Sequence, residues 1–257
     1  MLVRLSAACL LVWAWAAASA GAPEGMALIA GGAFTRGCDE VDDQHMGRPQ
    51  SVELDAFWMD KTEVTNAMFE SVFPEHRARR HATSACDDCP VTKVSWYEAS
   101  AFCKAVGKDL PTEAQWEKAA GAENGCRYPW GGELFRSPQE ARDSGLVRAG
   151  LPFEAGPSPV ARYPANRYGL YDMIGNVWEW TRDWAAAYDR SSPRNPEGPS
   201  SGIRKIRRGG AWSDELRGLI PAWRDWSRAD TPYYTDVGFR CAKNADEAPL
   251  SAFPREQ

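Results

Sequence analysis

The clearest alternation of apolar and polar residues lies in the stretch 177–180, which reads Val-Trp-Glu-Trp. A period of two is typical of a strand with one buried face. Gly175 and Asn176 come directly before this stretch and predict a tight turn at its start. If Trp178 and Trp180 share the inner face, they bury a large apolar area, and each indole N–H then needs an acceptor.

Shorter alternating runs predict further strands, and Gly-Gly pairs mark two of their turns. These runs are 26–34 (two strands around a Gly-Gly turn), 51–59, 204–212 and 237–242. Helical start and stop signals predict three helices, at 65–73, 95–107 and 112–120. Ser95 with Glu98, and Thr112 with Gln115, have the spacing of capping boxes.

Long polar or Pro/Gly-rich loops separate these elements, at 38–50, 75–90, 133–167 and 191–202. Short strands, few helices and long loops predict an α+β fold that is poor in regular secondary structure and rich in Trp and Gly. No internal repeat is visible in the 257 residues.

The two ends of the chain differ in composition from the rest. Residues 1–20 have the pattern of a signal peptide: Arg4, an apolar run, and an Ala-Ser-Ala cleavage site. We therefore expect an exported chain, periplasmic or secreted, with one domain at 21–243 and a loose C-terminal tail at 244–257. No later stretch is apolar enough to span a membrane.

Composition narrows the class of partner. The net charge is −5, and 12 Trp, 22 Gly and 18 Pro residues indicate a core of large rings held by turns. The chain has no long basic stripe, which argues against nucleic-acid binding. One domain of this length can bury a sizeable core.

Seven cysteines are present, and removal of Cys9 with the signal peptide leaves six. An even number in an oxidising compartment favours disulfides, but fifteen pairings are possible. Cys86 and Cys89 could form a redox pair or, with His76 and His81, a zinc site; a structural disulfide is the favoured interpretation. We expect Cys38, Cys86, Cys89 and Cys126 all to be oxidised.

Two further stretches carry candidate chemistry. Asp172 and Glu179 flank the Gly175-Asn176 turn, and carboxylates beside free carbonyls suit Ca²⁺, although spacing alone favours a polar turn capped by its own acids. The stretch 212–226 mixes rings and charges that would suit a cleft for a peptide or glycan, or that could simply cover the core. The candidate cleft residues are Trp212, Ser213, Asp214, Trp223 and Arg224.

A series of motifs gives the chain a resemblance to the formylglycine-generating enzyme family, also called sulfatase-modifying factors. The motifs occur in order along nearly all of the chain after the signal peptide: Gly31-Gly32-x-Phe34, 57–66 (FWMDKTEVTN), Pro90-Val91-x-x-Val94-Ser95-Trp96, 110–117 (LPTEAQWE), Tyr128-Pro129-Trp130-Gly131, 168–180 (YGLYDMIGNVWEW), Arg208-Gly209-Gly210-x-Trp212 and Gly238-Phe239-Arg240-Cys241.

The resemblance implies a C-type-lectin-like α+β fold with structural calcium. One family calcium site falls on the Asp172 and Glu179 carboxylates and the Gly175 and Val177 carbonyls, which reverses the preference for a capped polar turn. A family disulfide falls on Cys103 and Cys241. The family's second disulfide has no counterpart, since Ala120 stands where one partner would be, and the stretch 150–157 lacks the Asp expected of a second calcium site.

The chain departs from the family at the catalytic cysteine pair. Family members that make formylglycine carry two cysteines, spaced C-x4-C, which bind copper. Asp214 and Leu219 stand at those positions here, and no cysteine occurs between Cys126 and Cys241. Copper and the usual formylglycine chemistry are therefore not expected. Two hypotheses follow: an exported accessory or maturation factor that acts on a peptide-like product, or a non-catalytic module that binds a peptide or glycan.

Overall fold

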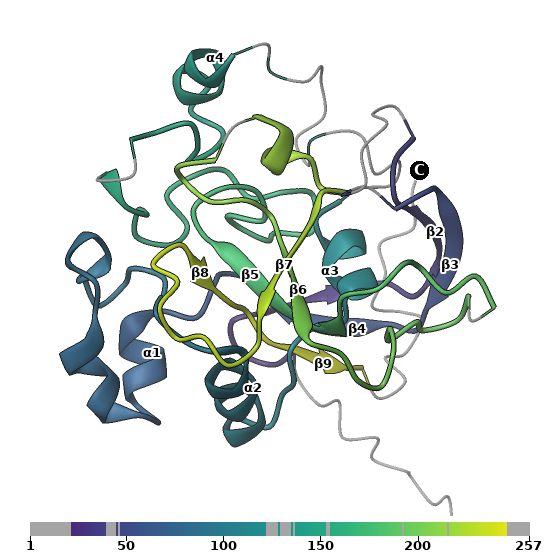
Figure 1. Cartoon of the computed structure of the whole chain (residues 1–257), viewed down its shortest axis with the longest axis horizontal. Coiled ribbons are helices and arrows are strands. Elements are labelled where there is room, and N and C mark those ends of the chain that lie inside the picture. Colours follow the sequence, from purple (N-terminus) through teal and green to yellow (C-terminus); the bar gives the residue numbers. More distant parts are fainter. Residues whose placement is uncertain are drawn as a thin grey trace, which may run out of the picture.

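Strands in three separate sheets form the framework of the domain (Figure 1). This computed structural model describes residues 22–39, 45, 47–121, 128, 135, 137–152, 155–191, 193–214 and 216–245. The predicted signal peptide, Cys126 and most of the predicted tail lie outside these ranges. No helix of the described part of the chain is long and apolar enough to cross a membrane.

The largest sheet has four strands in the order β7-β6-β5-β8 and lies at the centre of Figure 1. A second sheet has the order β1-β4-β9, and a third is the antiparallel pair β2-β3. The strands are β1 (Met26–Ile29), β2 (Gly32–Arg36), β3 (Gln50–Leu54), β4 (Phe57–Asp60), β5 (Trp178–Trp184), β6 (Arg204–Arg208), β7 (Arg224–Arg228), β8 (Val237–Gly238) and β9 (Ala242–Asn244).

The described part of the chain contains four short α-helices. They are α1 (Asn66–Glu70), α2 (Trp96–Ala105), α3 (Glu113–Ala119) and α4 (Pro138–Asp143), and short 3-10 helices occur at Pro74–Arg79, Ala82–Ser84 and Leu216–Leu219. Figure 1 shows α1 and α2 on one side of the molecule and the β2-β3 pair on the other. The expected α+β class is confirmed.

Local signals placed two of the helices accurately. Helices α2 and α3 begin one residue after Ser95 and Thr112, and both capping boxes are complete, with side-chain and backbone bonds in each direction. Helix α1 is shorter than predicted and ends at Glu70. Beyond it, a 3-10 helix begins with Pro74, because proline cannot continue the α-helical hydrogen bonding.

Other predicted boundaries are wrong. The run 51–59 is two strands, β3 and β4, which belong to different sheets, and 237–242 likewise divides between β8 and the start of β9. Helix α4, capped by Ser137, lies within a stretch predicted to be irregular. Strand β9 extends to Asn244, so the ordered domain continues past the expected boundary at residue 243.

The core has two main clusters of buried apolar side chains. One contains Trp116 and Leu219, and the other contains Trp180 and Trp212. Trp178 and Trp180 are both buried, as the alternation predicted, and the Trp180 indole donates to the Val94 carbonyl at 3.2 Å. These four tryptophans therefore lie in the interior, whereas other tryptophans are only partly buried: Trp58, Trp96, Trp184, Trp223 and Trp226.

Disulfides join elements that are distant in sequence as well as close neighbours. The structure contains the Cys103–Cys241 bond that the family resemblance implied, between α2 and the segment before β9. Cys86 is bonded to Cys89, and Cys38 is also disulfide-bonded. The predicted oxidation of Cys38, Cys86 and Cys89 is confirmed, and these cysteines are not available as zinc ligands.

Removing the Cys103–Cys241 bond should destabilise the fold far more than removing Cys86–Cys89. The sequence separations are 138 and 3 residues. The chain-entropy relation gives about 5 kcal/mol for the long loop and about 1.5 kcal/mol for the short one. We expect urea unfolding of the Cys103→Ser/Cys241→Ser protein to show the larger loss of unfolding free energy, with Cys86→Ser/Cys89→Ser as the matched control. Equal losses would contradict the loop-closure explanation.

Candidate functional site

A buried carboxylate lies on the face of β5 opposite the two indoles. Glu179 is 1% exposed, and both of its oxygens accept from the Arg240 guanidinium at 2.7 to 3.0 Å. Its Oε2 also accepts from the Trp116 indole at 2.8 Å. The acid in the Val-Trp-Glu-Trp pattern is therefore as deeply buried as the apolar residues beside it.

Arg240 connects Glu179 to the backbone of two other segments. Its Nη1 donates to the carbonyls of Asp60 and Lys61, and its Nη2 donates to the Tyr171 carbonyl at 2.8 Å. Charge-assisted bonds of this kind are among the strongest in proteins. The ion pair thus joins β4, β5 and the Tyr171 loop at one point.

Two more buried acids lie close to this pair. Burial raises the pKa of Asp172 to about 6, and the neighbouring charge of Glu179 raises it too. Burial, followed by the charge of Asp172, raises the pKa of Glu63 well above its usual range. Glu63 Oε1 accepts from Asn176, but its buried Oε2 has no hydrogen-bond partner. Three carboxyl groups therefore share one guanidinium.

The turn between these acids has the conformation that the Gly-Asn pair predicted. Asp172, Gly175 and Asn176 all have positive φ angles, of 54°, 79° and 60°. A Cβ on Gly175 would lie 2.5 Å from the Arg148 carbonyl oxygen, so only glycine fits there. Among the described residues, no three His, Cys, Asp or Glu side chains are grouped as metal ligands. Any cation here would depend on backbone carbonyls as well.

Glu63 was not among the residues expected at this site. It lies in the motif 57–66, more than a hundred residues before Asp172, and nothing in its local pattern marks it as buried. The motif shared with the family was the only available signal. The tertiary structure brings it to Asn176.

The predicted cleft at 212–224 is wrong for its two main residues. Trp212 is fully buried in the core. Arg224 is buried and makes two bonds to Glu113, at 2.6 and 2.9 Å, so its charge is already paired. Strand β7, which the sequence did not predict, begins at Arg224 and draws it into the sheet. Ser213, Asp214 and Trp223 are only partly buried.

The two positions of the family's cysteine pair have structural roles here. The Asp214 carboxyl group accepts a hydrogen bond from the backbone N–H of Ala211, three residues earlier, at 2.6 Å. Burial raises the pKa of Asp214 to about 6. Leu219 is completely buried in the core cluster of Trp116. Neither residue presents a soft sulfur ligand.

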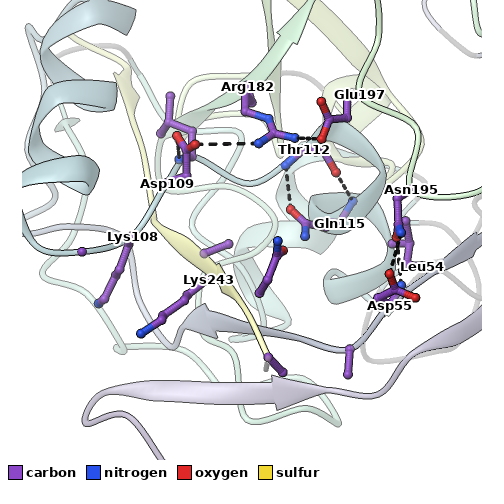
Figure 2. Close-up of a pocket in the computed structure, with 16 residues that line it drawn as sticks. Leu54, Asp55, Lys108, Asp109, Thr112, Gln115, Arg182, Asn195, Glu197 and Lys243 are labelled. Carbon is purple, nitrogen blue, oxygen red and sulfur yellow. Dashed lines mark hydrogen bonds and ion pairs between the residues drawn. The ribbon is translucent and has the colours of Figure 1, made fainter. Parts of the chain in front are cut away.

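A polar pocket lies elsewhere, between the β3–β4 corner, the segment 107–115 and β9 (Figure 2). Its cavity measures about 380 Å³. Figure 2 shows Arg182 between Asp109 and Glu197, with Lys108 and Lys243 together at the lower left of the view. The lining residues are Leu54, Asp55, Ala56, Gly107, Lys108, Asp109, Leu110, Thr112, Gln115, Arg182, Asn195, Glu197, Ala242, Lys243, Asn244 and Ala245.

The floor of this pocket includes a sheet edge. Strand β9 is an edge strand, and Ala242 exchanges two backbone hydrogen bonds with Asp109, at 2.7 and 2.9 Å. Asn244 continues the strand along the pocket wall. Charged groups of both signs, side-chain amides and a strand edge suit a polar, hydrogen-bonding ligand.

These features define a C-type-lectin-like α+β domain with a buried acid cluster at its central turn. The family described as sulfatase-modifying factor enzyme 1-like domain matches residues 15–245. The chain belongs to this family of formylglycine-generating enzymes and their relatives.

Similar proteins carry different names. A formylglycine-generating enzyme of Bos taurus is 30% identical over 291 residues, which cover 89% of this chain and 76% of that protein. A Chlamydia pneumoniae protein named serine/threonine-protein kinase pkn1 is 36% identical over 248 residues, but the chain spans only 38% of its length.

Solved structures share the fold. Treponema denticola variable protein 1 has a TM-score of 0.70 and 25% identity, covering 86% of this chain and 95% of that one. The structure of PvdO from Pseudomonas aeruginosa has a TM-score of 0.68 and 19% identity, covering 86% and 94%. The latter likeness concerns the fold alone.

Removing the guanidinium of Arg240 should strongly destabilise the domain. Arg240→Met leaves Glu179 buried without its partner, a change that typically costs about 3–5 kcal/mol. Urea unfolding should show this loss. Arg228→Met is the matched control, because Arg228 pairs with Asp230 in an exposed position, and no measurable change is expected. A small effect of Arg240→Met would show that the buried pair is not needed for stability.

Proposed function

We propose that the chain is an exported accessory or maturation factor of the formylglycine-generating enzyme family that acts on a peptide-like product without the family's usual copper- and cysteine-dependent formylglycine chemistry. The observation that carries this proposal is the pair of residues at the family's cysteine positions. A hydrogen-bonded Asp214 and a core Leu219 supply no thiolate for copper, which prefers soft sulfur ligands. The remaining chemistry of the domain is recognition.

The polar pocket of Figure 2 supports a peptide-like ligand. An extended peptide could continue the hydrogen bonding of β9 at Asn244, and its polar side chains would meet charges of both signs. The second candidate is a non-catalytic module that binds a glycan, which the same amides and charged groups would also suit. In both cases the chain works in the extracytoplasmic space, as the N-terminal pattern predicts.

We also propose that Ca²⁺ occupies the central turn. The residues present fit a cation. Arg240 is the one guanidinium beside the carboxyl groups of Glu63, Asp172 and Glu179, burial and mutual repulsion raise the pKa values of Glu63 and Asp172, and the Glu63 Oε2 atom is buried without a hydrogen-bond partner. Asp172 and Glu179 would be the side-chain ligands, with the Gly175 and Val177 carbonyls. When bound, calcium would supply charge neutralisation and hold the turn that leads into β5.

The proposed function predicts that the protein binds a peptide and forms no formylglycine. The mature protein, incubated with copper, oxygen and a peptide that contains the CxPxR motif, should produce no formylglycine by mass spectrometry, while a formylglycine-generating enzyme with the cysteine pair serves as positive control. On peptide and glycan arrays, we expect peptide binding that Lys243→Ala/Asn244→Ala weakens at least fivefold.

Lys61→Ala is the matched control for the array experiment, since Lys61 is an exposed lysine outside the pocket. Aldehyde formation by this protein would contradict the absence of oxidation. Glycan binding with no peptide binding would replace the first candidate by the second. Binding that the pocket variant does not change would remove the pocket from the proposal.

Calcium removal should lower the melting temperature. A ligand at a hundredfold excess over its Kd stabilises the fold by about 2.7 kcal/mol, which for a domain of this size corresponds to roughly 5–10 °C. Asp172→Asn should abolish most of the shift caused by a chelator. This variant is preferable to Glu179→Gln, because Glu179 also holds Arg240.

Asp230→Asn is the control for this experiment, since it neutralises an exposed carboxyl group whose partner is Arg228 rather than a residue of the turn. It should retain the full chelator-dependent shift. An equal shift in wild type and Asp172→Asn, or no shift in wild type, would show that the acids only cap the turn.

A further inference from the structure

A second pocket, of about 220 Å³, lies beside Asp183 and is separate from the acid cluster of the central turn. We refer to it as the Asp183 pocket. Asp183 and Arg36 both line it, together with Tyr188 and the loop 195–199. The volume is enough for several water molecules, at about 30 Å³ each, or for one small organic ligand.

The buried charges that the structure describes around this pocket are paired with two exceptions, and the exposed acids Asp189 and Glu197 also line it. Glu113 binds Arg224, and Glu117 binds Arg208, in two buried ion pairs. Asp183 and Arg36 remain, each only 3% exposed. Neither forms an ion pair with any side chain in the described part of the protein.

The carboxyl group of Asp183 has an oxygen available to a ligand. Oδ2 accepts from the Glu113 backbone N–H at 2.7 Å. Oδ1 accepts no hydrogen bond from the residues that the structure describes. An ionised carboxylate that is buried without a cation is costly, and a ligand ammonium group would remove that cost.

The guanidinium of Arg36 could bind the anionic group of a ligand, as Asp183 could bind its cationic group. Its Nε and Nη2 donate to Gln50 Oε1, at 3.2 and 2.8 Å, and its plane lies 3.8 Å over the Tyr188 ring. Nη1 donates to no acceptor within the described ranges. Gln50 is neutral, so Arg36 has no charged hydrogen-bond partner, and its charge is balanced only through space by the surrounding acids Glu113, Glu117, Asp183 and Asp189.

We infer that the Asp183 pocket binds a small zwitterion of amino-acid size, with its ammonium group on Asp183 and its carboxylate on Arg36. A single ligand then neutralises both unpaired charges at once. A peptide terminus carries only one of the two charges, so the free amino acid is the better match. This inference concerns a different pocket from the proposed peptide site and does not depend on it.

Titration of Asp183 gives a readout that needs no variant. Burial raises the pKa of Asp183 to about 7, and the charge of Glu113 raises it as well. The other charged groups that face Asp183 are Arg36, Arg182 and Lys205. Because an ammonium group favours the ionised carboxylate, ligand binding near pH 6.5 should release a proton. Affinity should rise with pH through 7 and level off above it.

Isothermal titration calorimetry on the whole mature protein tests the inference. The probes are L-alanine, L-leucine, L-glutamine and L-lysine, with ethylamine and propionate as the single-charge analogues. At least one amino acid should bind at least tenfold more tightly than either analogue. Titration in buffers of different ionisation enthalpy should show proton release near pH 6.5.

Asp183→Asn should weaken amino-acid binding at least tenfold and abolish proton release, and it retains an oxygen for the Glu113 N–H. Arg36→Gln should weaken binding to a similar extent. Asp230→Asn, which removes an exposed acid, is the matched control and should change neither.

Three results would overturn the inference: no binding of any of the four amino acids at millimolar concentration, ethylamine binding as tightly as the best amino acid, or binding without proton release in the wild-type protein. Each is measured on the unaltered chain, so a variant that fails to fold does not affect the decision.

Discussion

The buried ion pair between Arg240 and Glu179 is the interaction on which the other parts of the domain depend. Glu179 lies on the central strand β5, and Arg240 precedes the last strand, β9. The pair also holds the Trp116 indole of α3 and the backbone carbonyls of Asp60 and Tyr171. In a chain with so little regular structure, long-range side-chain bonds replace much of the order that continuous sheets would supply. A buried pair of this kind is costly to form and more costly to break, because either partner alone would be an uncompensated buried charge.

The buried acids of the domain differ in whether an arginine pairs with them, and this difference distinguishes structural acids from candidate ligand-binding acids. Glu113 and Glu117 each form an ion pair with an arginine, so their buried charges are balanced within the fold. Glu63 and Asp172 lie near a single guanidinium, that of Arg240, which already pairs with Glu179. This shortage of positive charge supports the calcium proposal. Asp183 forms no direct ion pair with the residues that the structure describes and lines a cavity, which supports a ligand. The same physical cost, that of a buried and unpaired charge, leads to two different proposals. The acids Glu63 and Asp172 surround a tight turn, which suits a metal ion, whereas Asp183 lines a pocket, which suits a small ligand.

The family relationship and the altered cysteine positions point in different directions. The chain belongs to a family that includes enzymes, and its fold is that of the family. Asp214 and Leu219, however, are integrated into the local hydrogen bonding and the core. A buried leucine at the second position shows that the surrounding core has adapted to an apolar side chain. The polar pockets lie instead around β9 and the loop 195–199.

The sequence by itself determined the features that depend on near neighbours. The caps at Ser95 and Thr112, the turn at Gly175 and the buried indoles of β5 all follow from local spacing, because capping, positive φ angles and alternation act over a few residues. The motifs also indicated the family, and the resemblance to that family implied the Cys103–Cys241 pairing, which cysteine spacing alone left open among fifteen. Tertiary structure alone decided that Arg224 is an ion-pair partner rather than a cleft residue, since its acid lies 111 positions away. The division of 51–59 between two sheets was decided in the same way. The partner of a buried charge and the sheet that a strand joins depend on which distant segment supplies the hydrogen bonds and counter-charges. The local sequence pattern contains no information about that distant segment.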